Sequence, residues 1–418
     1  MDEATLRFEG FADSALLSGK VSIGITEDAL VCDALFAGQA VAYADIDRIT
    51  FTDYTLCLTA GRETLRLSRL GQSGQWLFEK LSAAYHACVL KALLVEQAPL
   101  FTANGRCETL GGAVELRLFP DSLCLLPPNG GARRLPLCFF NDLRQENYAL
   151  CLRLTSGERY CISGIGYDLA PLCGAIGQAL RTQRSATAAF LTKLVPMLSK
   201  SEAAQFAVRF AEGIAVPLSA LPASLAGALE QKAQNSKMDY RRLKQLGNSE
   251  TMAIGICALP EELVDELAAA LLEQKNENAE TPAEALGEKE LDALRWRVFA
   301  VLAAPDGQSV IAEFAFPDED AATYVFRTGG DTAAFLPVLN RALEANHLGR
   351  ELFSLPEEAL RSPQKAKQRM LLQRTPALQT LRRAFVGKAI HRSAESWESS
   401  VRKLLAAAPA PSVPPQRP

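Results

Sequence analysis

The sequence predicts an α+β protein whose N-terminal part holds two tandem copies of one β-rich unit, each ending in a helix. Three observations predict this: a repeat at a nearly constant spacing, alternation of apolar and polar residues within each copy, and a change to helical spacing at the end of each copy. The chain has 418 residues, of which 48% are hydrophobic, so it can form two to four domains with cores of their own.

The repeat is clearest where Asp53–Leu58 (Asp-Tyr-Thr-Leu-Cys-Leu) matches Asn147–Leu152 (Asn-Tyr-Ala-Leu-Cys-Leu), 94 positions further on. Upstream, the apolar residues from Val21 onward meet their counterparts 93 positions later. Downstream, the matches that begin at Leu67 lie 95 positions apart. The spacing drifts by one residue at each turn region, as short loop insertions cause. The two segments are therefore copies of one structural unit.

Each copy predicts short antiparallel strands followed by a helix. Val21–Ile25 and Val114–Leu118 alternate apolar and polar residues, as half-buried strands do. Turn-forming pairs separate such runs, namely Glu27-Asp28, Ala37-Gly38, Ala60-Gly61, Asn129-Gly130 and Ser156-Gly157. Apolar residues then recur at helical spacing behind Ser73 or Asp168, either of which can cap a helix.

This order of about seven strands and a final helix resembles the pleckstrin-homology-like (PH-like) domains. The polar-aliphatic segment Val41–Ile46 before the central strands adds to the likeness, which covers roughly Ala4–Leu94 and Arg106–Thr187. The resemblance implies tandem PH-like antiparallel β-barrels or sandwiches, each closed by a C-terminal helix. It also implies binding of either a lipid headgroup or a peptide.

The remaining chain predicts more helix. We expect a first PH-like unit at residues 1–100, a second unit at 101–187 and a helical connector at 188–250. A possible degenerate third PH-like unit with a helical insertion follows at 251–350, then a basic helical region at 351–405 and a disordered tail at 406–418. The third unit rests on strand patterns around the Pro305-Asp306-Gly307 turn. Helices are predicted for Pro363–Gln373 and Pro376–His391, each beginning with proline.

No catalytic, cofactor or metal motif is found in the sequence. The three histidines, His86, His347 and His391, lack a recognisable catalytic spacing to an acid and a nucleophile, and paired-cysteine zinc motifs are absent. Ser73 fits a helix cap better than a nucleophile elbow, because the glycine spacing is one residue short. We therefore expect no enzyme activity, no cofactor and no bound metal.

Phosphoinositide binding is disfavoured. In PH domains, lysine and arginine around the first strand pair neutralise the headgroup phosphates. The corresponding loop, Ala12–Gly19, contains no lysine or arginine, and neither does Glu108–Gly112 in the second copy. The alternative for this fold is recognition of a protein or peptide along an open sheet edge or in the groove beside the C-terminal helix.

A basic segment is the other candidate contact. Arg361–Lys403 contains eleven lysines and arginines against two acids, although the whole chain has a net charge of −4. The candidate anion- or partner-binding residues are Lys365, Lys367, Arg369, Arg374, Arg382, Arg383, Lys388 and Arg392. Three interpretations stay open: a packed helix with a solvated face, a contact to nucleic acid or another anionic surface, and a clamp on acidic parts of the same chain.

The sequence favours the cytoplasm. Its N-terminus is acidic and lacks a signal-peptide pattern, no segment predicts a transmembrane helix, and ten scattered cysteines without paired motifs indicate reduced thiols. The functional hypothesis is a non-catalytic, cytoplasmic protein-interaction scaffold built on tandem PH-like units. The alternative is a nucleic-acid- or anionic-surface-associated factor that uses residues 361–403.

Overall fold

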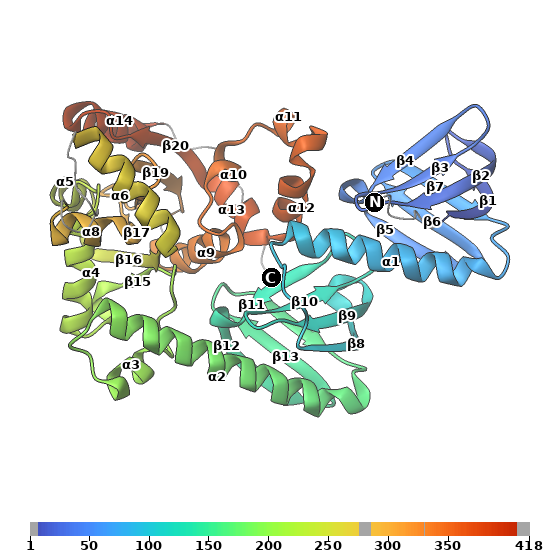
Figure 1. Cartoon of the computed structure of the whole chain (residues 1–418), viewed down its shortest axis with the longest axis horizontal. Helices are drawn as coiled ribbons and strands as arrows, with labels where there is room; N and C mark the ends of the chain where they lie inside the picture. Colours follow the sequence, from blue (N-terminus) through green and yellow to red (C-terminus); the bar gives the residue numbers. More distant parts are fainter. Residues whose placement is uncertain (1–6, 276–285, 330, 408–418) are drawn as a thin grey trace. The chain divides into compact units, whose positions relative to one another are not determined.

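The computed structural model describes residues 7–275, 286–329 and 331–407 (Figure 1). The predicted α+β class and the antiparallel sheets are confirmed. The chain forms two compact units, which are described separately below. Unit 1 contains Met1–Gln183 and Leu355–Gln379, and unit 2 contains Arg184–Ser354 and Thr380–Pro418. The predicted tail lies outside the described residues from position 408 onward.

In unit 1, the first copy folds into seven antiparallel strands followed by a helix. The elements are β1 (Arg7–Asp13), β2 (Ser18–Ile25), β3 (Ala29–Asp33), β4 (Gly38–Ala42), the 3-10 helix η1 (Tyr43–Asp45), β5 (Arg48–Thr52), β6 (Thr55–Ala60), β7 (Glu63–Ser68) and α1 (Ser73–Ala92). The strand order is β4-β3-β2-β1-β7-β6-β5, so β4 and β5 are the two edges and hydrogen bonds do not close the sheet into a barrel.

The second copy repeats this succession. Its elements are β8 (Phe101–Cys107), η2 (Glu108–Leu110), β9 (Gly112–Leu118), β10 (Ser122–Leu126), β11 (Arg133–Pro136), η3 (Leu137–Phe139), β12 (Phe140–Glu146), β13 (Ala149–Leu154), β14 (Arg159–Ile162), η4 (Gly166–Asp168) and α2 (Leu169–Leu194). The strands form a four-stranded sheet, β11-β10-β9-β8, and a three-stranded sheet, β12-β13-β14. The 3-10 helices η1 and η3 begin 94 positions apart, at the spacing of the sequence repeat.

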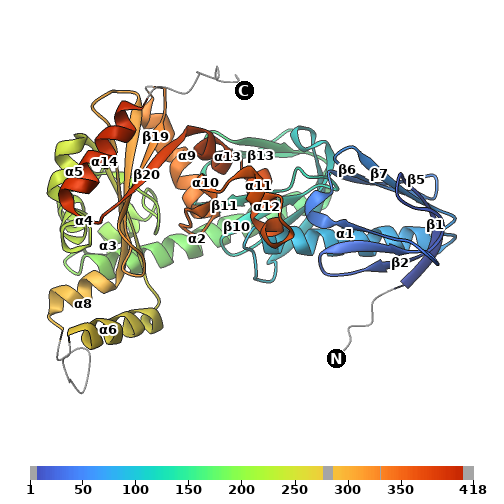
Figure 2. The same cartoon turned by 90° about the horizontal axis from the view of Figure 1, so that it is seen from above.

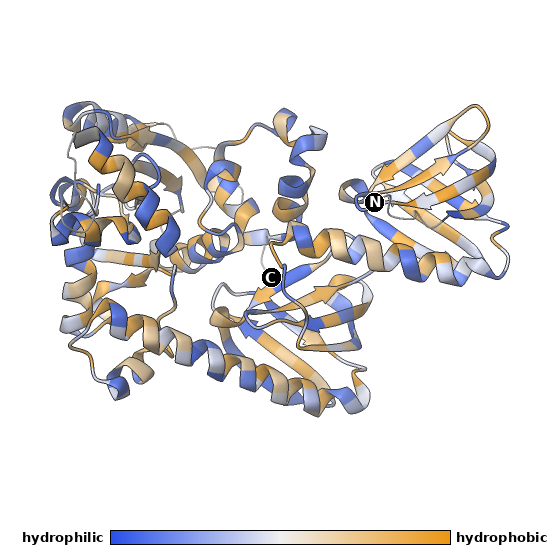
Figure 3. Ribbon diagram, in the orientation of Figure 1, coloured by the Kyte–Doolittle hydropathy of each residue, from blue (hydrophilic) through white to orange (hydrophobic). Residues whose placement is uncertain are grey.

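The alternation in the sequence places one face of each strand in the core. Val21 and Ile23 of β2 are buried, as are their counterparts Val114 and Leu116 of β9, while the residues between them are partly exposed. Figure 3 shows the same division, with orange apolar segments along the strands and alternating orange and blue turns on α1. Burial of aliphatic side chains, worth about 1.5–3 kcal/mol each, is thus the main force that holds each copy together.

A glycine occupies the point in each copy where the first strand crosses the last. A Cβ atom on Gly10 would lie 2.8 Å from Leu70 and 3.2 Å from the backbone oxygen of Ser68. A Cβ atom on Gly105, 95 positions later, would lie 2.8 Å from Ile162 and 3.0 Å from the Ser163 oxygen. Both copies therefore need a residue without a side chain at this crossing.

We predict that Gly105→Ala lowers the free energy of unfolding by about 1–3 kcal/mol, because the added methyl group overpacks the crossing. Gly10→Ala should have a similar effect. The matched control is Gly174→Ala in α2, where a Cβ meets nothing within 4 Å and alanine should stabilise the helix by about 0.5–1 kcal/mol. Denaturant titration of the three variants measures the difference, and equal stability of Gly105→Ala and wild type would contradict the packing argument.

The two copies are joined by main-chain hydrogen bonds at the outer edge of β5. The Ile49 N–H donates to the Pro128 oxygen at 2.9 Å, and the Gly130 N–H donates to the Asp47 oxygen at 2.8 Å. The hydroxyl of Tyr85 on α1 donates to the Asn129 oxygen at 3.1 Å. The turn at 128–130 in the second copy therefore pairs with β5 and α1 of the first copy.

An ion-pair cluster adds a second link between the copies. His86 on α1 is buried, and its Nδ1 lies 3.0 Å from a carboxylate oxygen of Glu115 on β9. Arg117 donates to the same carboxylate at 2.6 Å. Burial of the Glu115 carboxyl opposes its ionisation, but the hydrogen bonds from His86 and Arg117 outweigh this effect and lower its pKa to about 2.

This low pKa predicts acid sensitivity of unit 1. Because the pKa of Glu115 is lower in the folded state than its ordinary value of 4.5, its contribution is fully present above pH 4.5 and is lost as the pH falls toward 2. Glu115→Gln should therefore flatten the decline of thermal stability over this range. Melting curves of wild type and variant at matched pH values test the prediction, and parallel declines would contradict it.

Unit 2 is built on one six-stranded antiparallel sheet, in the order β15-β16-β17-β18-β19-β20. Its strands are β15 (Val216–Pro217), β16 (Asn248–Ala258), β17 (Trp296–Ala303), β18 (Ser309–Ala315), β19 (Ala322–Arg327) and β20 (Phe385–Ile390). Its helices include α3 (Lys200–Phe206), α4 (Ala223–Asn235), α5 (Tyr240–Leu246), α6 (Glu261–Lys275), α8 (Glu288–Leu294), α9 (Thr332–Ala345), α10 (Glu351–Ser354) and α14 (Ala394–Ala406).

Both faces of this sheet are buried. Every residue of β18 is buried, which requires cover on both sides. On one face, Ile311 and Val325 join the core cluster that contains Leu229 of α4 and Leu243 of α5. On the other face, the ring of Phe326 contacts rings from α9 and α10. Helix α14, which Figure 2 shows beside β20, packs on the first face through Trp397 and Val401.

One sequence expectation differs from this arrangement. The predicted helix Pro376–His391 is wrong in its second half, because α13 (Pro376–Ala384) ends before β20, which pairs with β19. The residues expected to form a possible third PH-like unit contribute β16, β17, β18 and β19 to this six-stranded sheet. Helix α6 occupies the position of the expected helical insertion.

Candidate functional site

The predicted basic residues do not form one continuous element. Lys365, Lys367, Arg369 and Arg374 belong to unit 1, whereas Arg382, Arg383, Lys388 and Arg392 belong to unit 2. The first four lie on η6 (Pro363–Lys365) and α12 (Ala366–Arg374), and the others follow on α13, on β20 and just after it. The sequence run is thus divided between two folded bodies.

Several of these residues contact the protein itself, among them Arg369, Arg374 and Arg382. Arg369 forms an ion pair with Asp45 at 2.6 Å and donates to the Leu360 oxygen. Arg374 is 1% exposed and donates to the Tyr85 hydroxyl at 3.0 Å. In unit 2, Arg382 donates to the Leu352 oxygen at 2.9 Å. These contacts agree with the interpretation of a packed helix and, at Asp45, with an internal clamp. Lys367, Arg383, Lys388 and Arg392 are exposed.

A buried polar cluster in unit 2 brings His391 to an acid that the sequence spacing does not reveal. Glu313 on β18 is fully buried, and one of its oxygens lies 2.7 Å from Nε2 of His391. Its other oxygen accepts from the Thr323 hydroxyl, which itself accepts from the Trp397 indole N–H at 2.6 Å. The cluster connects α14 to β18 and β19, and the described contacts include no nucleophile beyond this threonine.

We predict a structural role for this cluster. Trp397→Phe should lower the free energy of unfolding by about 1–3 kcal/mol, because it removes both the hydrogen bond to Thr323 and buried ring volume. Trp76→Phe is the control, since Trp76 is 45% exposed and its loss should change stability by less than about 0.5 kcal/mol. Denaturation of both variants measures the contrast, and equal effects would refute a special role for Trp397.

An open pocket lies in the first copy, between β4 and the β6–β7 hairpin. Its volume is about 280 Å³, which suits one or two side chains. The lining residues are Leu16, Gln39, Ala40, Val41, Ala42, Asp45, Leu58, Ala60, Glu63 and Leu65, and none of them is a lysine or an arginine. The pocket therefore combines aliphatic side chains with polar groups, and its charged groups are acidic.

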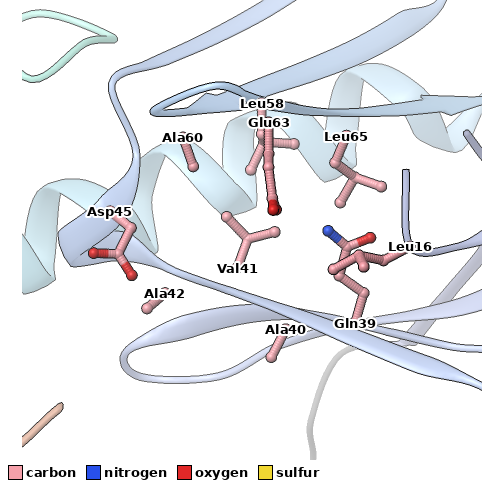
Figure 4. Close-up of a pocket in the computed structure, with 10 residues that line it drawn as sticks. All are labelled: Leu16, Gln39, Ala40, Val41, Ala42, Asp45, Leu58, Ala60, Glu63 and Leu65. Carbon is pink, nitrogen blue, oxygen red and sulfur yellow. The ribbon is translucent and has the colours of Figure 1, made fainter. Parts of the chain in front are cut away.

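Two polar side chains face this pocket from opposite sides. Figure 4 shows the carboxylate of Glu63 and the amide of Gln39 directed into the space above Val41. The Gln39 oxygen accepts from the Ser14 hydroxyl at 2.7 Å, which fixes the β1–β2 loop against β4. The ion pair with Arg369 neutralises Asp45, whereas Glu63 has no ion-pair partner within 4.0 Å in the part of the chain that the structure describes.

The edge strand beside the pocket lacks the usual protection of a sheet edge. Edge strands commonly carry charged residues, proline or a bulge that prevents pairing with another chain. Strand β4 reads Gly-Gln-Ala-Val-Ala and pairs with β3 in regular register. In contrast, β12 contains a bulge, and its Arg144 forms ion pairs with Asp142 and Glu146. Among the described strands, none pairs with the outer edge of β4, which is thus open to a further strand, whereas β12 is guarded.

The register identifies the groups that β4 presents outward. The Tyr43 N–H donates to Asp28 and the Ala34 N–H donates to Ala37, at the two ends of the β3–β4 ladder. Since hydrogen-bonded pairs alternate along an antiparallel ladder, Gln39 and Val41 bond to β3. The N–H and C=O groups of Ala40 and Ala42 consequently point away from the sheet.

Exposed apolar side chains lie at the neighbouring loops. Leu16 in the β1–β2 loop is 67% exposed, and Leu35 and Phe36 in the β3–β4 loop are 87% and 95% exposed. Isolated exposed apolar residues are common, but these three lie beside the pocket or the open strand. Leu16 lines the pocket, and Leu35 and Phe36 precede Gly38, the first residue of β4. The pocket, the edge of β4 and these loops together form the candidate site.

The other groove considered in the sequence analysis is occupied in the first copy. Residues 128–130 pair with β5 and contact α1 through Tyr85, as described above. This segment lies where a peptide that pairs with β5 beside the C-terminal helix would bind. The edge of β4 is therefore the open edge of the first sheet.

Sequence reasoning did not identify the pocket residues. The available signal was the absence of charge and proline in residues 38–42, between two turn sequences. Gln39, Val41 and Glu63 come together only through the fold, because β4 and β7 are far apart in sheet order.

No protein-family model matches this chain, and no curated protein matches it. Within the described residues, no group of three or more histidine, cysteine, aspartate or glutamate side chains is arranged to hold a metal ion. Among the helices described here, none has the length and apolar character needed to cross a membrane.

Proposed function

We propose that this chain is a non-catalytic, cytoplasmic interaction scaffold whose first copy binds an extended peptide segment of a partner protein along β4. The observation that carries the proposal is an unguarded edge strand beside a pocket lined by aliphatic and acidic side chains. A PH-like identity of both copies is part of the proposal. It is supported by the repeated order of four strands, three strands and a helix.

The chemistry of the site favours a peptide with a lysine or arginine. An added strand bonds to the outward groups of Ala40 and Ala42, and its alternate side chains turn toward the pocket. A long basic side chain places its aliphatic stem against Val41 and Leu65 and its cation beside Glu63. The exposed Leu35 and Phe36 offer a further apolar contact at the end of the strand.

The nucleic-acid alternative has less support. It depends on the exposed lysines and arginines of residues 361–403, which belong to two different units. Arg369, Arg374 and Arg382 are held in internal contacts and contribute less positive charge to a binding surface. Phosphate binding at the pocket itself is disfavoured by Glu63 and by the absence of basic lining residues.

The test uses the full chain and a displayed library of random peptides. We expect enriched peptides to contain a lysine or arginine among apolar residues. Ala40→Pro should weaken binding of a synthetic enriched peptide at least about tenfold, since proline removes an outward N–H without breaking the β3–β4 ladder. Glu63→Gln should weaken it several-fold and reduce the preference for a basic residue.

The matched control is Ala40→Ser, which keeps the N–H and nearly keeps the size. It should bind the peptide as the wild-type chain does. Circular dichroism and thermal melting establish that each variant is folded. If the enriched peptides bind Ala40→Pro as tightly as wild type, or if no peptide is enriched, the proposal is wrong.

A further inference from the structure

Two cysteines face each other on the outer surface of the second copy. Cys151 on β13 pairs directly with Cys161 on β14 in the antiparallel register, and their sulfur atoms lie 2.7 Å apart. The neighbouring residues Leu150, Leu152 and Ile162 are buried, so the alternation of the strands directs both thiols to the opposite face. Cys161 is exposed and Cys151 is partly exposed.

This pair differs from cysteines that serve as packing residues. Cys124 is fully buried, and burial raises the pKa of its thiol to about 12. Such a thiol is unreactive, because the thiolate is the nucleophile. The outward pair at 151 and 161 makes no comparable contribution to the core, and its exposure leaves Cys161 accessible to a reagent in solution.

Exposure gives the two thiols different roles, because Cys161 is more accessible than Cys151. The hydrogen bond with Cys161, together with slight burial, raises the pKa of Cys151 to about 11. Cys151 thus keeps its proton and can donate it to a thiolate at Cys161. Arg153 and Arg159 form the next outward pair along the same two strands, and the exposed Cys161 is the thiol that a reagent in solution reaches first.

The first copy lacks this pair. The residue that corresponds to Cys151 is Cys57, and Cys57 pairs across the strands with Arg66. Arg66 corresponds to Cys161 at a spacing of 95. The two copies share a framework and differ at this position, so the facing thiols are a feature of the second copy rather than of the fold.

We propose that Cys151 and Cys161 form a redox-active dithiol that is reversibly oxidised to a cross-strand disulfide by exchange with a low-molecular-weight disulfide. Directly opposed residues of antiparallel strands have Cα atoms roughly 4.5–5.5 Å apart. This separation lies inside the range of roughly 4.4–6.8 Å that a disulfide requires. The bond can therefore form without moving the backbone.

The exchange proceeds in two balanced steps. The Cys161 thiolate attacks one sulfur of the small disulfide, which forms a mixed disulfide and releases one small thiolate. Cys151 then loses its proton to solvent, and its sulfur attacks the Cys161 sulfur and releases the second small thiolate. The protein loses two electrons and two protons, and the small disulfide gains them as two thiols.

The test treats the reduced full-length protein with glutathione disulfide and measures intact mass and peptide maps. Wild type should lose the mass of two hydrogen atoms and yield a peptide pair that links 151 to 161, and dithiothreitol should reverse both changes. Cys151→Ser should instead retain a glutathionyl group on Cys161, because the resolving thiol is missing. Cys161→Ser should form no bridge.

Two further variants serve as matched controls in the first copy. Cys57→Ser should oxidise as wild type does, because Cys57 has no facing thiol. Arg66→Cys, which recreates the facing pair in the first copy, should gain a second bridge between positions 57 and 66. The proposal is overturned if wild type forms no 151–161 bridge under conditions in which Arg66→Cys forms its own, or if Cys161→Ser loses two hydrogens as wild type does.

Discussion

The pairing of residues 128–130 with the edge of β5 organises unit 1. The first copy alone has two sheet edges, β4 and β5, and a small β unit of this kind gains stability by covering an edge. The second copy supplies that cover from its β10–β11 loop, and Tyr85 and His86 on α1 extend the contact to Asn129 and Glu115. The cover at β5 also leaves β4 as the edge that can receive another strand.

Much of the first unit could be predicted from the sequence because its signals are local. The alternation around Val21 and Val114 and the turn pairs between strands depend on residues next to one another. The same is true of the hairpin at Asp306-Gly307, which joins β17 to β18. Local patterns of this kind reflect burial of one face, and burial is what the structure retains.

The errors and omissions arise from contacts between distant residues. Phe385–Ile390 follows a helix and has no turn before it, so only pairing with β19 makes it a strand. The sequence left open whether Arg369 and Arg374 contact solvent, a partner or the same chain, and it could not identify Asp45 and Tyr85, about three hundred positions earlier, as the groups that engage them. The acid partners of His86 and His391 likewise could not be predicted from sequence spacing, because the fold alone brings them together.

The turn at 128–130 competes with any free peptide for the β5 edge. Because it is covalently tethered to the first copy, it meets the β5 edge at an effective concentration of order millimolar, independent of how much protein is present. A free peptide at micromolar concentration cannot displace a ligand held at such a concentration unless it binds far more tightly. The β5 edge is therefore occupied at Asp47–Ile49 at any protein concentration, and dilution leaves that occupancy unchanged.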